Sequence, residues 1–358
     1  MKLLYITNGI NGIGGLERVL SIKCSYFADK LGHDVHIITL NEGDVAPFYS
    51  FSERIKFHSV LTSGRGLKYL QSYTKEINKI VSLVQPDVIS VCDDGLKGLY
   101  IPIWIKKGNS ALIYERHASM KLNNSRLQTI LMKIGGLLYD KVVVLTQYNT
   151  TEWLGKNKVV IPNPITFTPN EKASLKEKRI ICVGSIAHHK GYDLLIDAWR
   201  QIAKSCPEWK IDIFGKGDSS ELQEMIDEYH LQDNIHFCGT TNNVKQELLH
   251  SSFLVLPSRS EGFGMVLIEA MACGLPCVAF DCPCGPRDII ENGKSGFLIP
   301  PENSTLLAEG IKKMISDTDK MNKMGDYAFN SVSQYLIENV AERWQNLFQK
   351  VIKKEHTA

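Results

Sequence analysis

The sequence lacks any uninterrupted run of about 18 apolar residues, the length that a helix needs to cross a bilayer. The apolar stretch at its start, MKLLYITNG, is too short for the core of a signal peptide. Low-complexity tracts and repeats of about 20 to 50 residues are also missing, which argues against disordered, solenoid and propeller proteins. We therefore expect a cytoplasmic globular protein without a membrane-spanning helix.

The nine cysteines form no repeated CxxC pairs and have no His-rich partner segment, so neither a zinc site nor a disulfide framework is expected. Several lie in apolar, strand-like runs such as IICVG at 180–184, where cysteine acts as a small hydrophobic residue. This usage is typical of the reducing cytosol. We interpret the Cys282-Pro-Cys284 pair as loop packing.

A strong net charge is missing too, because 41 Lys and Arg against 39 Asp and Glu leave only +2. The two halves nevertheless differ. Residues 1–165 hold 20 basic and 13 acidic residues, a net +7, whereas residues 166–358 hold 21 and 26, a net −5. The basic first half favours an anionic partner, either phosphate groups or a lipid surface, although ordinary solvated charge gives the same count. We expect no nucleic-acid partner.

The length of 358 residues fits two domains of roughly 150 to 200 residues better than one core. Short β-branched runs alternate with helical periodicity from the start, as in KLLYIT at 2–7 and DVHIITL at 34–40. Three prolines within VVIPNPITFTPN at 159–170 interrupt the alternation and predict an extended linker. The further strands expected are 86–92, 111–117 and 141–146 before the linker, and 179–185, 210–217, 234–239, 253–258 and 276–281 after it.

This pattern predicts an α/β fold of two doubly wound, Rossmann-like domains facing a central cleft. The first domain is expected to hold residues 1–162 together with a C-terminal helix over about 335–358, which folds back onto it. The second is expected to hold residues 163–334.

The strongest functional signal is the segment SRSEGFGMVLIEAMACGLP at 258–276. Gly262 and Gly264 allow backbone N–H groups to approach an anion closely, and a helix starting near Met265 can hold a phosphate at its N-terminus. Glu269 lies one turn into this helix, so its carboxylate can reach a ribose diol while the helix dipole faces a diphosphate. A solvated glutamate beside a glycine turn is the simpler interpretation of any such short motif.

Glu261 and Glu269 stand eight residues apart around the helix start. Here the sequence resembles the retaining family-4 glycosyltransferases, whose signature is a glutamate, seven residues and a second glutamate. The resemblance covers most of the chain, is strongest over 179–300, and implies the two-domain GT-B fold. It implies that Glu261 contacts hydroxyls of the donor sugar and that Glu269 binds the ribose. The backbone expected to hold the sugar and phosphate is that of Gly262, Phe263, Gly264, Met265 and Val266.

Lys190 lies in the loop of VGSIAHHKGYDLLIDAW at 183–199, between a predicted strand and helix. Its ammonium can neutralise the charge that develops on a departing diphosphate. A surface lysine is usually only solvated, but the match to the family's Lys-Gly pair implies a catalytic role at the donor. Many relatives carry an arginine five residues earlier, where this sequence has Ser185. Candidates for the missing cation are His188, His189, Arg287 and Arg18, and without a substitute the chain would be slow or degenerate.

Arg287 belongs to GPRDIIENGKSGFLIP at 285–300, which also matches the family pattern. We consider two roles for it equally, a phosphate contact and an ordinary salt-bridge partner at a helix start.

The first half offers two further candidates. The glycine-rich loop NGINGIGGLERV at 8–19 is not GxGxxG, so it is a weak dehydrogenase signal. Its Gly14-Gly15 pair resembles the family's first-strand loop, which lets the acceptor and the donor phosphate approach the backbone. His117 follows a predicted strand, at the end where α/β proteins assemble their sites. A lone histidine is more often structural, but the resemblance implies a contact with the transferred sugar, and we do not assign it as a general base.

Asp93-Asp94 could suggest a metal-binding carboxylate pair, but no companion ligand accompanies it, and Mg²⁺ sites usually combine carboxylates with substrate phosphates. The resemblance implies that no metal is needed. We expect no metal or other cofactor, a nucleotide-diphosphate sugar as co-substrate, and either solvation or an acceptor contact for the two aspartates.

Residues 126–138, RLQTILMKIGGLL, place six apolar residues on one helical face, with Arg126, Lys133, Lys121 and Lys141 around it. This face can lie in a membrane interface. For the stretch taken alone we favour the alternative, a helix packed on the sheet with its basic residues outward. A second basic stretch, equally open to solvation, holds Arg65, Lys68, Lys75 and Lys79.

Together these features predict retaining transfer of a hexose or N-acetylhexosamine from a nucleotide-diphosphate sugar, with a UDP-sugar favoured over GDP-mannose. The expected acceptor, bound by the first domain, is a glycan or a polyprenyl-diphosphate-linked intermediate of surface polysaccharide biosynthesis. Peripheral contact with the inner face of the cytoplasmic membrane follows from the basic first domain. Two alternatives are a nucleotide-sugar epimerase or hydrolase on the same frame, and a non-catalytic sugar-nucleotide-binding protein, which Ser185 makes conceivable.

Overall fold

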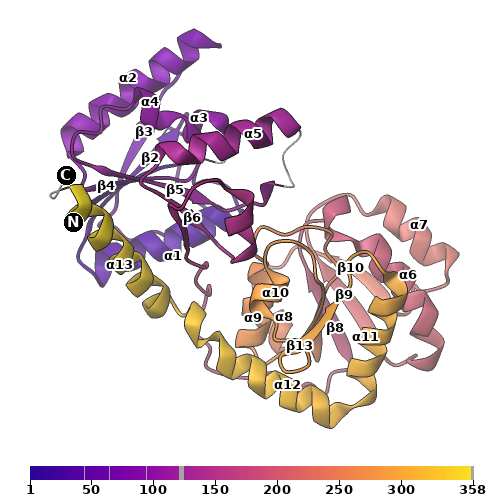
Figure 1. Ribbon diagram of the computed structural model, residues 1–358. Coiled ribbons are helices and arrows are strands. Elements are labelled where there is room, and N and C mark those ends of the chain that lie inside the picture. The colour runs from indigo at the N-terminus through magenta and orange to yellow at the C-terminus, as the bar shows by residue number, and fades with distance from the viewer. Residues whose placement is uncertain (44, 64, 94, 121–124, 356–358) are drawn as a thin grey trace. The chain divides into compact units, whose positions relative to one another are not determined.

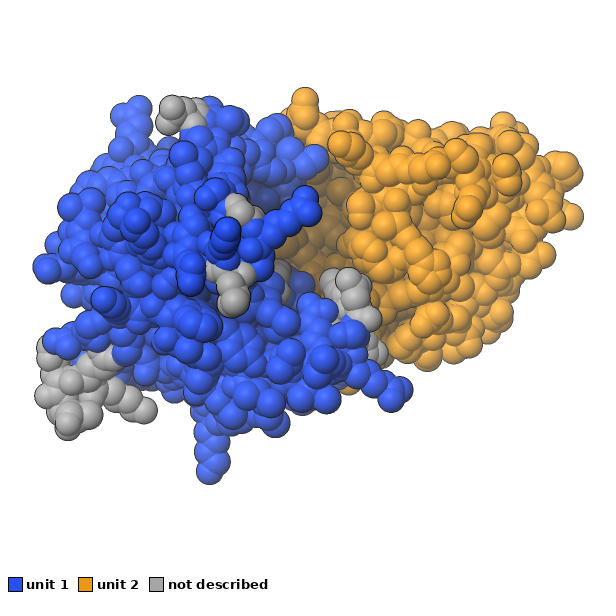
Figure 2. Space-filling model, turned by 90° about the horizontal axis from the view of Figure 1, so that it is seen from above, with its two compact units in different colours: residues 1–166, 335–358 blue, residues 167–334 orange. Residues whose placement is uncertain are grey.

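The computed structural model describes residues 1–43, 45–63, 65–93, 95–120 and 125–355. The chain forms two compact units, Met1–Thr166 with Tyr335–Ala358 and Phe167–Gln334, which are coloured separately in Figure 2. The boundary at 166/167 falls slightly later than the 162/163 expected from the sequence. Each unit contains one parallel sheet, so the prediction of two doubly wound α/β domains is confirmed.

The sheet of the first unit has the strand order β3-β2-β1-β4-β5-β6-β7. The order reverses between β1 and β4, and sheets of this kind bind ligands at the carboxyl ends of the strands beside that reversal. The strands are β1 (Lys2–Ile6), β2 (Asp34–Leu40), β3 (Lys56–Val60), β4 (Val88–Val91), β5 (Ala111–Arg116), β6 (Lys141–Val144) and β7 (Lys158–Val160).

Helices cover both faces of this sheet (Figure 1). One face packs on α1 (Gly15–Asp29) and α13 (Ile337–Glu355), and the other on α2 (Leu67–Val84) and α5 (Arg126–Gly135). Two short helices, α3 (Leu96–Leu99) and α4 (Ile101–Trp104), and two 3-10 turns, η2 (Gly136–Leu138) and η3 (Tyr148–Glu152), complete the unit.

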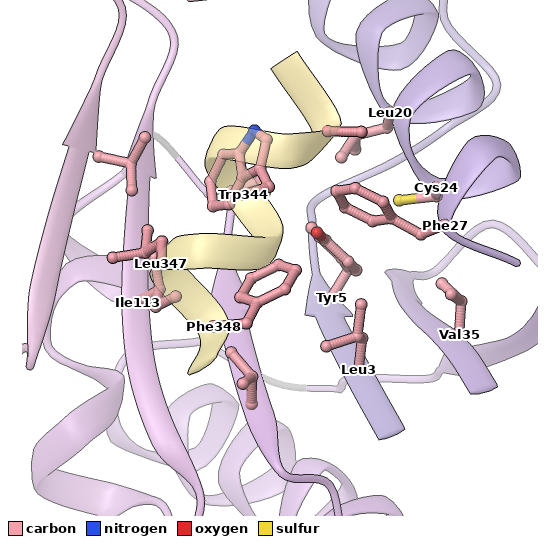
Figure 3. Packing of buried hydrophobic residues seen from close by; sticks show 14 of the residues in the cluster. Leu3, Tyr5, Leu20, Cys24, Phe27, Val35, Ile113, Trp344, Leu347 and Phe348 are labelled. Carbon is pink, nitrogen blue, oxygen red and sulfur yellow. The ribbon is translucent and has the colours of Figure 1, made fainter. Parts of the chain in front are cut away.

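The C-terminal helix α13 is part of the core of the first unit. Its Trp344 and Phe348 point toward α1 and β1, where Figure 3 shows them beside Leu20, Phe27 and Tyr5. The rings of Phe27 and Phe348 meet edge to face with centroids 5.7 Å apart, a favourable aromatic geometry. Helix α13 therefore stabilises the unit that β1 begins.

The second unit repeats the same winding, with the strand order β10-β9-β8-β11-β12-β13 and its reversal between β8 and β11. Its strands are β8 (Arg179–Val183), β9 (Lys210–Phe214), β10 (Ile235–Gly239), β11 (Phe253–Leu256), β12 (Cys277–Phe280) and β13 (Gly296–Ile299). Its helices are α6 (Tyr192–Ile202), α7 (Ser220–Glu228), α8 (Val244–Leu249), α9 (Met265–Ala272), α10 (Pro286–Ile289), α11 (Ser304–Ser316) and α12 (Thr318–Ser331), with 3-10 turns η4 (His188–Lys190), η5 (Ala203–Ser205) and η6 (Val332–Tyr335).

Three strands were missed by the sequence analysis. The edge strand β3 is mostly exposed and so has no apolar run to mark it. β7 lies at the start of the segment expected to be linker, and it pairs in parallel with β6 before the prolines begin. β13 is only four residues long and lies inside a segment interpreted for its loop.

The expectation that α5 packs on the sheet through its leucines and isoleucines is wrong. Leu127, Ile130 and Ile134 are 66%, 55% and 47% exposed. The helix instead packs through Met132 and Gly135, where an added β-carbon would lie 2.6 Å from Cγ of Leu99. The side of α5 that carries Gly135 thus packs closely on α3, and the larger apolar side chains point away from the protein. Lys121 lies outside the described residues.

No helix in the described ranges is both long enough and apolar enough to span a membrane.

Candidate functional site

The candidate site lies at the reversal of the second sheet, in the loops that follow β8 and β11. These loops touch through Gly191, which has a φ of 68°. A β-carbon there would lie only 2.0 Å from the carbonyl oxygen of Pro257, so any side chain would force the loops apart. Glycine is the one residue that tolerates both this conformation and this contact.

Arg259 fastens the two loops together. Its backbone N–H donates to the carbonyl of His189 at 2.8 Å, and its guanidinium donates to the carbonyl of His188 at 2.9 Å. The same guanidinium forms a two-pronged ion pair with Asp193, at 2.8 and 2.6 Å. Burial raises the pKa of Asp193, but the hydrogen bonds and charge of Arg259 outweigh it and leave that pKa lowered. Arg259 therefore holds the loop that carries Lys190.

The sequence analysis did not identify Arg259. Its partner Asp193 stands 66 residues earlier, and no spacing rule connects a loop arginine to an aspartate in the first turn of a distant helix. Its place directly between the two serines of SRSEGFG was the only available signal.

Lys190 and Glu261 meet at the centre of the site. The ammonium of Lys190 donates to Oε1 of Glu261 at 2.7 Å, and the hydroxyl of Ser258 donates to the same oxygen at 2.6 Å. Both side chains are largely buried, with 16% and 8% exposed. Next to them, the buried hydroxyl of Ser260 has no hydrogen-bond partner among the described residues, which leaves a polar group for a ligand to satisfy.

The helix α9 begins directly after Glu261, at Met265, as the sequence predicted. Gly264 precedes it with a φ of 88°, and no described side chain caps this end. The first N–H groups of a helix lack partners within it and carry partial positive charge, so the start of α9 can bind an anion. Glu269 is buried in the second turn of this helix.

The loop after β12 supports this helix start from the other side. A β-carbon on Gly285, whose φ is 127°, would lie 2.0 Å from the carbonyl oxygen of Phe263. The backbone at Phe263 is thus held by the close contact with Gly285, and the backbone at Pro257, earlier in the same loop, by the close contact with Gly191. A rigid backbone here presents its N–H groups in a fixed direction.

The first unit carries its own cluster of polar residues at the carboxyl ends of its strands. Nε2 of His117, which follows β5, lies 3.2 Å from Oε2 of Glu115. Gly14 precedes α1 with a φ of −75°, and a β-carbon on Gly15 would meet nothing within 4 Å. A β-carbon on Gly12 or Gly14 would instead lie 2.4 or 2.5 Å from a carboxylate oxygen of Glu17, so the Glu17 side chain lies against this loop and only the Gly15 position is open.

The interpretation of Asp93 as a solvated loop residue is wrong. Asp93 is buried after β4, where it accepts hydrogen bonds from the side chain of Asn8 and the N–H of Gly95, both at 2.9 Å, and pairs with Lys97 at 3.0 Å. Asp94 lies outside the described residues.

Comparison with known proteins identifies the family. Residues 165–331 match the model of "Glycosyl transferases group 1", and residues 13–134 match "Glycosyl transferase 4-like". An uncharacterized glycosyltransferase of Haemophilus influenzae is 32% identical over 355 residues, which cover 97% of this chain and 99% of that protein. This chain belongs to the glycosyltransferases.

Other relatives support the same conclusion. The amylovoran biosynthesis glycosyltransferase AmsD of Erwinia amylovora is 27% identical over 360 residues, 97% of this chain and 99% of AmsD. Among solved structures, Anabaena HepE in complex with UDP matches with a TM-score of 0.81 at 20% identity, covering 98% of this chain and 100% of HepE. The HepE complex with UDP-glucose matches with a TM-score of 0.79. The fold of this glycosyltransferase is that of the GT-B enzymes.

The structure bears on which residue could replace the positive charge of the arginine that many relatives have where this glycosyltransferase has Ser185. Ser185 is exposed after β8. Burial, and then the charge of Lys190, lower the pKa of His189, which makes it a poor source of positive charge at neutral pH. Arg287 forms a two-pronged ion pair with Asp281 at 2.8 and 2.6 Å, so the salt-bridge role is present and the phosphate role stays a prediction.

Lys216 is a further candidate that the sequence analysis missed. It follows β9, and its carbonyl accepts a hydrogen bond from the N–H of Ile186 at 2.8 Å, which brings it beside Ser185. Within the described part of the glycosyltransferase its ammonium has no ion-pair partner.

Substitution at Gly191 tests whether the loop contact shapes the site. We expect Gly191→Ala to lower the melting temperature and to loosen the loop, because alanine adds both a left-handed strain of about 1–2 kcal/mol and a clash with Pro257. Gly239→Ala is the matched control, since Gly239 has a φ of 70° but open space around it. Thermal unfolding and limited proteolysis measure the difference. Equal losses in the two variants would show that the contact contributes nothing.

Proposed function

We propose that this glycosyltransferase moves a hexose or N-acetylhexosamine from a UDP-sugar to a glycan or polyprenyl-diphosphate-linked acceptor of surface polysaccharide biosynthesis, with retention of anomeric configuration. The observation that carries the proposal is the meeting of Lys190, Glu261 and the uncapped start of α9 at the reversal of the second sheet. Cation, carboxylate and helix terminus are the three groups that a sugar diphosphate needs. The UDP-glucose complex of HepE and the amylovoran role of AmsD support the donor and the pathway class.

In the proposed mechanism, the N–H groups at Met265 and Val266 bind the diphosphate, and Lys190 shares its ammonium between Glu261 and the departing phosphate oxygens. Glu261 accepts hydrogen bonds from hydroxyls of the sugar, and Glu269 accepts them from the ribose. The acceptor hydroxyl attacks from the face that the diphosphate leaves, and the diphosphate takes its proton. Lys190 and the N–H groups at Met265 and Val266 are in place before the reaction, and they stabilise the negative charge that develops on the departing diphosphate. The mechanism assigns no step to a metal ion.

The donor is identified by a thermal-shift series with UDP-, GDP- and ADP-sugars, followed by incubation of the labelled donor with an acceptor panel. We expect UDP-sugars to stabilise the protein most and transfer to depend on the acceptor. Formation of an epimerised sugar nucleotide would favour an epimerase. Release of free sugar without an acceptor would favour a hydrolase. Tight donor binding without turnover would favour a sugar-nucleotide-binding protein. The anomeric configuration of the product, read by NMR, tests retention.

Replacing Lys190 by methionine is expected to lower the rate of transfer by about 10²–10³-fold, the usual effect of removing one group that stabilises developing charge. Lys204→Met is the control, because Lys204 is an exposed lysine of the same unit. A Lys190→Met rate within about threefold of the wild type would contradict the assignment.

We further propose that α5 and η2 contact the membrane that carries the acceptor. Their exposed apolar residues, with Arg126 and Lys133 beside them, match the amphipathic surface that inserts among anionic lipids. The exposed residues are Leu127, Ile130, Ile134, Leu137 and Leu138.

Sedimentation with vesicles containing anionic lipid tests this surface. The triple variant Leu127→Ser, Ile130→Ser, Ile134→Ser is expected to sediment less than the wild type, since it removes the apolar area that membrane binding would bury. Leu83→Ser is the matched control, because Leu83 on α2 is 77% exposed. No wild-type binding at low salt would defeat the membrane proposal while leaving the donor chemistry untouched.

A further inference from the structure

A buried ionic network lies beneath His117 in the first unit, and we call its members Lys23, Glu115 and His117 the histidine network. Lys23 from α1 and Glu115 from β5 form an ion pair at 2.5 Å, with side chains 1% exposed on each side. Ser90 on β4 donates to the other carboxylate oxygen at 2.6 Å, and His117 lies 3.2 Å from the first. Both oxygens of Glu115 are therefore occupied.

The network determines which nitrogen of His117 carries hydrogen. Burial raises the pKa of Glu115, but the charge of Lys23 and the hydrogen bond with His117 outweigh it and lower that pKa to about 2. Glu115 is therefore a carboxylate at neutral pH and can only accept hydrogen bonds. The Nε2 of His117 must then be the donor. In the neutral imidazole this leaves Nδ1 with a lone pair and no hydrogen.

That lone pair has no partner within the protein. Nδ1 of His117 is buried without a hydrogen bond among the described residues, and only 8% of the side chain is exposed. A buried acceptor left unpaired costs free energy, and a ligand that donates a hydrogen bond recovers it. Any hydrogen-bond donor fits this position, and a hydroxyl is the donor that a sugar carries.

A metal ion is the competing explanation, because Cys92, Glu115 and His117 offer ligand atoms within 4.8 Å of one another. The ammonium of Lys23 argues against it. It already occupies the corner beside Oε2 of Glu115, the same oxygen that His117 approaches. A second cation there would meet uncompensated repulsion.

The position of Lys23 is itself fixed by the C-terminal helix. Its ammonium lies 4.3 Å from the ring centroid of Trp344 and 5.0 Å from that of Tyr5. Aromatic faces of this kind stabilise a desolvated cation. A buried ion pair adds little to stability compared with apolar residues of the same shape, so its contribution is better sought in the orientation of His117.

We propose that Glu115 is a positioning residue that holds His117 in the Nε2–H tautomer, so that Nδ1 accepts a hydrogen bond from a ligand hydroxyl. Lys23 keeps Glu115 ionised and balances its charge, so that His117 faces a carboxylate whose charge is already paired. The identity of the hydroxyl as one of the sugar substrates rests on the proposed function. The tautomer does not depend on it.

The test uses the full-length protein with Lys23→Met and Glu115→Gln combined, which removes both charges and leaves neither one unpaired. The side-chain amide introduced by Glu115→Gln can donate to Nε2, so we expect His117 to change to the Nδ1–H tautomer. Nitrogen-15 NMR of histidine-labelled protein reports this directly, and His33, which pairs with Gln345 at 2.7 Å, is the internal control. We expect kcat/KM for transfer to fall at least tenfold. Glu115→Asp, which keeps the carboxylate, should retain the wild-type tautomer and part of the activity.

Several outcomes would overturn the proposal. A wild-type ring with hydrogen on Nδ1 would refute the tautomer, and this measurement needs no variant. A changed tautomer with unchanged kcat/KM would refute the positioning role and leave the proposed function intact. Zinc bound in equimolar amount by the wild type and lost in His117→Ala would show a metal site instead. If the wild type transfers no sugar at all, the proposed function fails, and the NMR result still decides the tautomer.

Discussion

The close approach of two backbone segments at Gly191 and Pro257 is the constraint on which the candidate site depends. No side chain fits between them, so the loop after β8 and the loop after β11 are in direct backbone contact. Lys190 stands directly before this contact and Glu261 four residues after it, and their 2.7 Å ion pair follows from that geometry. Arg259 adds the hydrogen bonds that hold the first loop in place. Backbone packing thus places Lys190 and Glu261 close enough to pair.

Both units place their polar residues by the same rule. Parallel strands end at one edge of each sheet, and the reversal of strand order opens that edge to a ligand. In the second unit the edge presents a lysine, a glutamate and a helix N-terminus, which suits an anion. In the first unit it presents ion pairs, the partly buried one of Asp93 with Lys97 and the fully buried one of Glu115 with Lys23, whose charges cancel. The first unit therefore places His117 beside an ion pair rather than beside an unpaired charge.

The sequence predicted the architecture and the start of α9 well. Strand β2 and the start of α9 were located correctly because buried parallel strands and glycine-flanked helix starts leave strong local patterns. The remaining features depend on contacts between distant residues. Three features depend on which segment lies opposite in space, and the spacing of residues along the chain does not show this. They are the pairing of Arg259 with Asp193, the pairing of Asp93 with Lys97, and the side of α5 that faces the protein. Helix α5 shows most clearly what local spacing cannot predict. Its leucines and isoleucines have the spacing of a buried face, yet they are exposed, and the helix packs through Met132 and Gly135.

The central claim is that the start of α9 binds a sugar nucleotide through its diphosphate and its ribose, and Glu269 gives the most direct test. Calorimetry would compare the binding of UDP and 2′-deoxy-UDP to the wild type and to Glu269→Gln. If the carboxylate holds the ribose, removing the 2′-hydroxyl should weaken wild-type binding about tenfold or more, as expected for a hydrogen bond to a charged group, and should change binding to Glu269→Gln much less. Equal losses in both proteins, or no UDP binding to the wild type, would contradict the account.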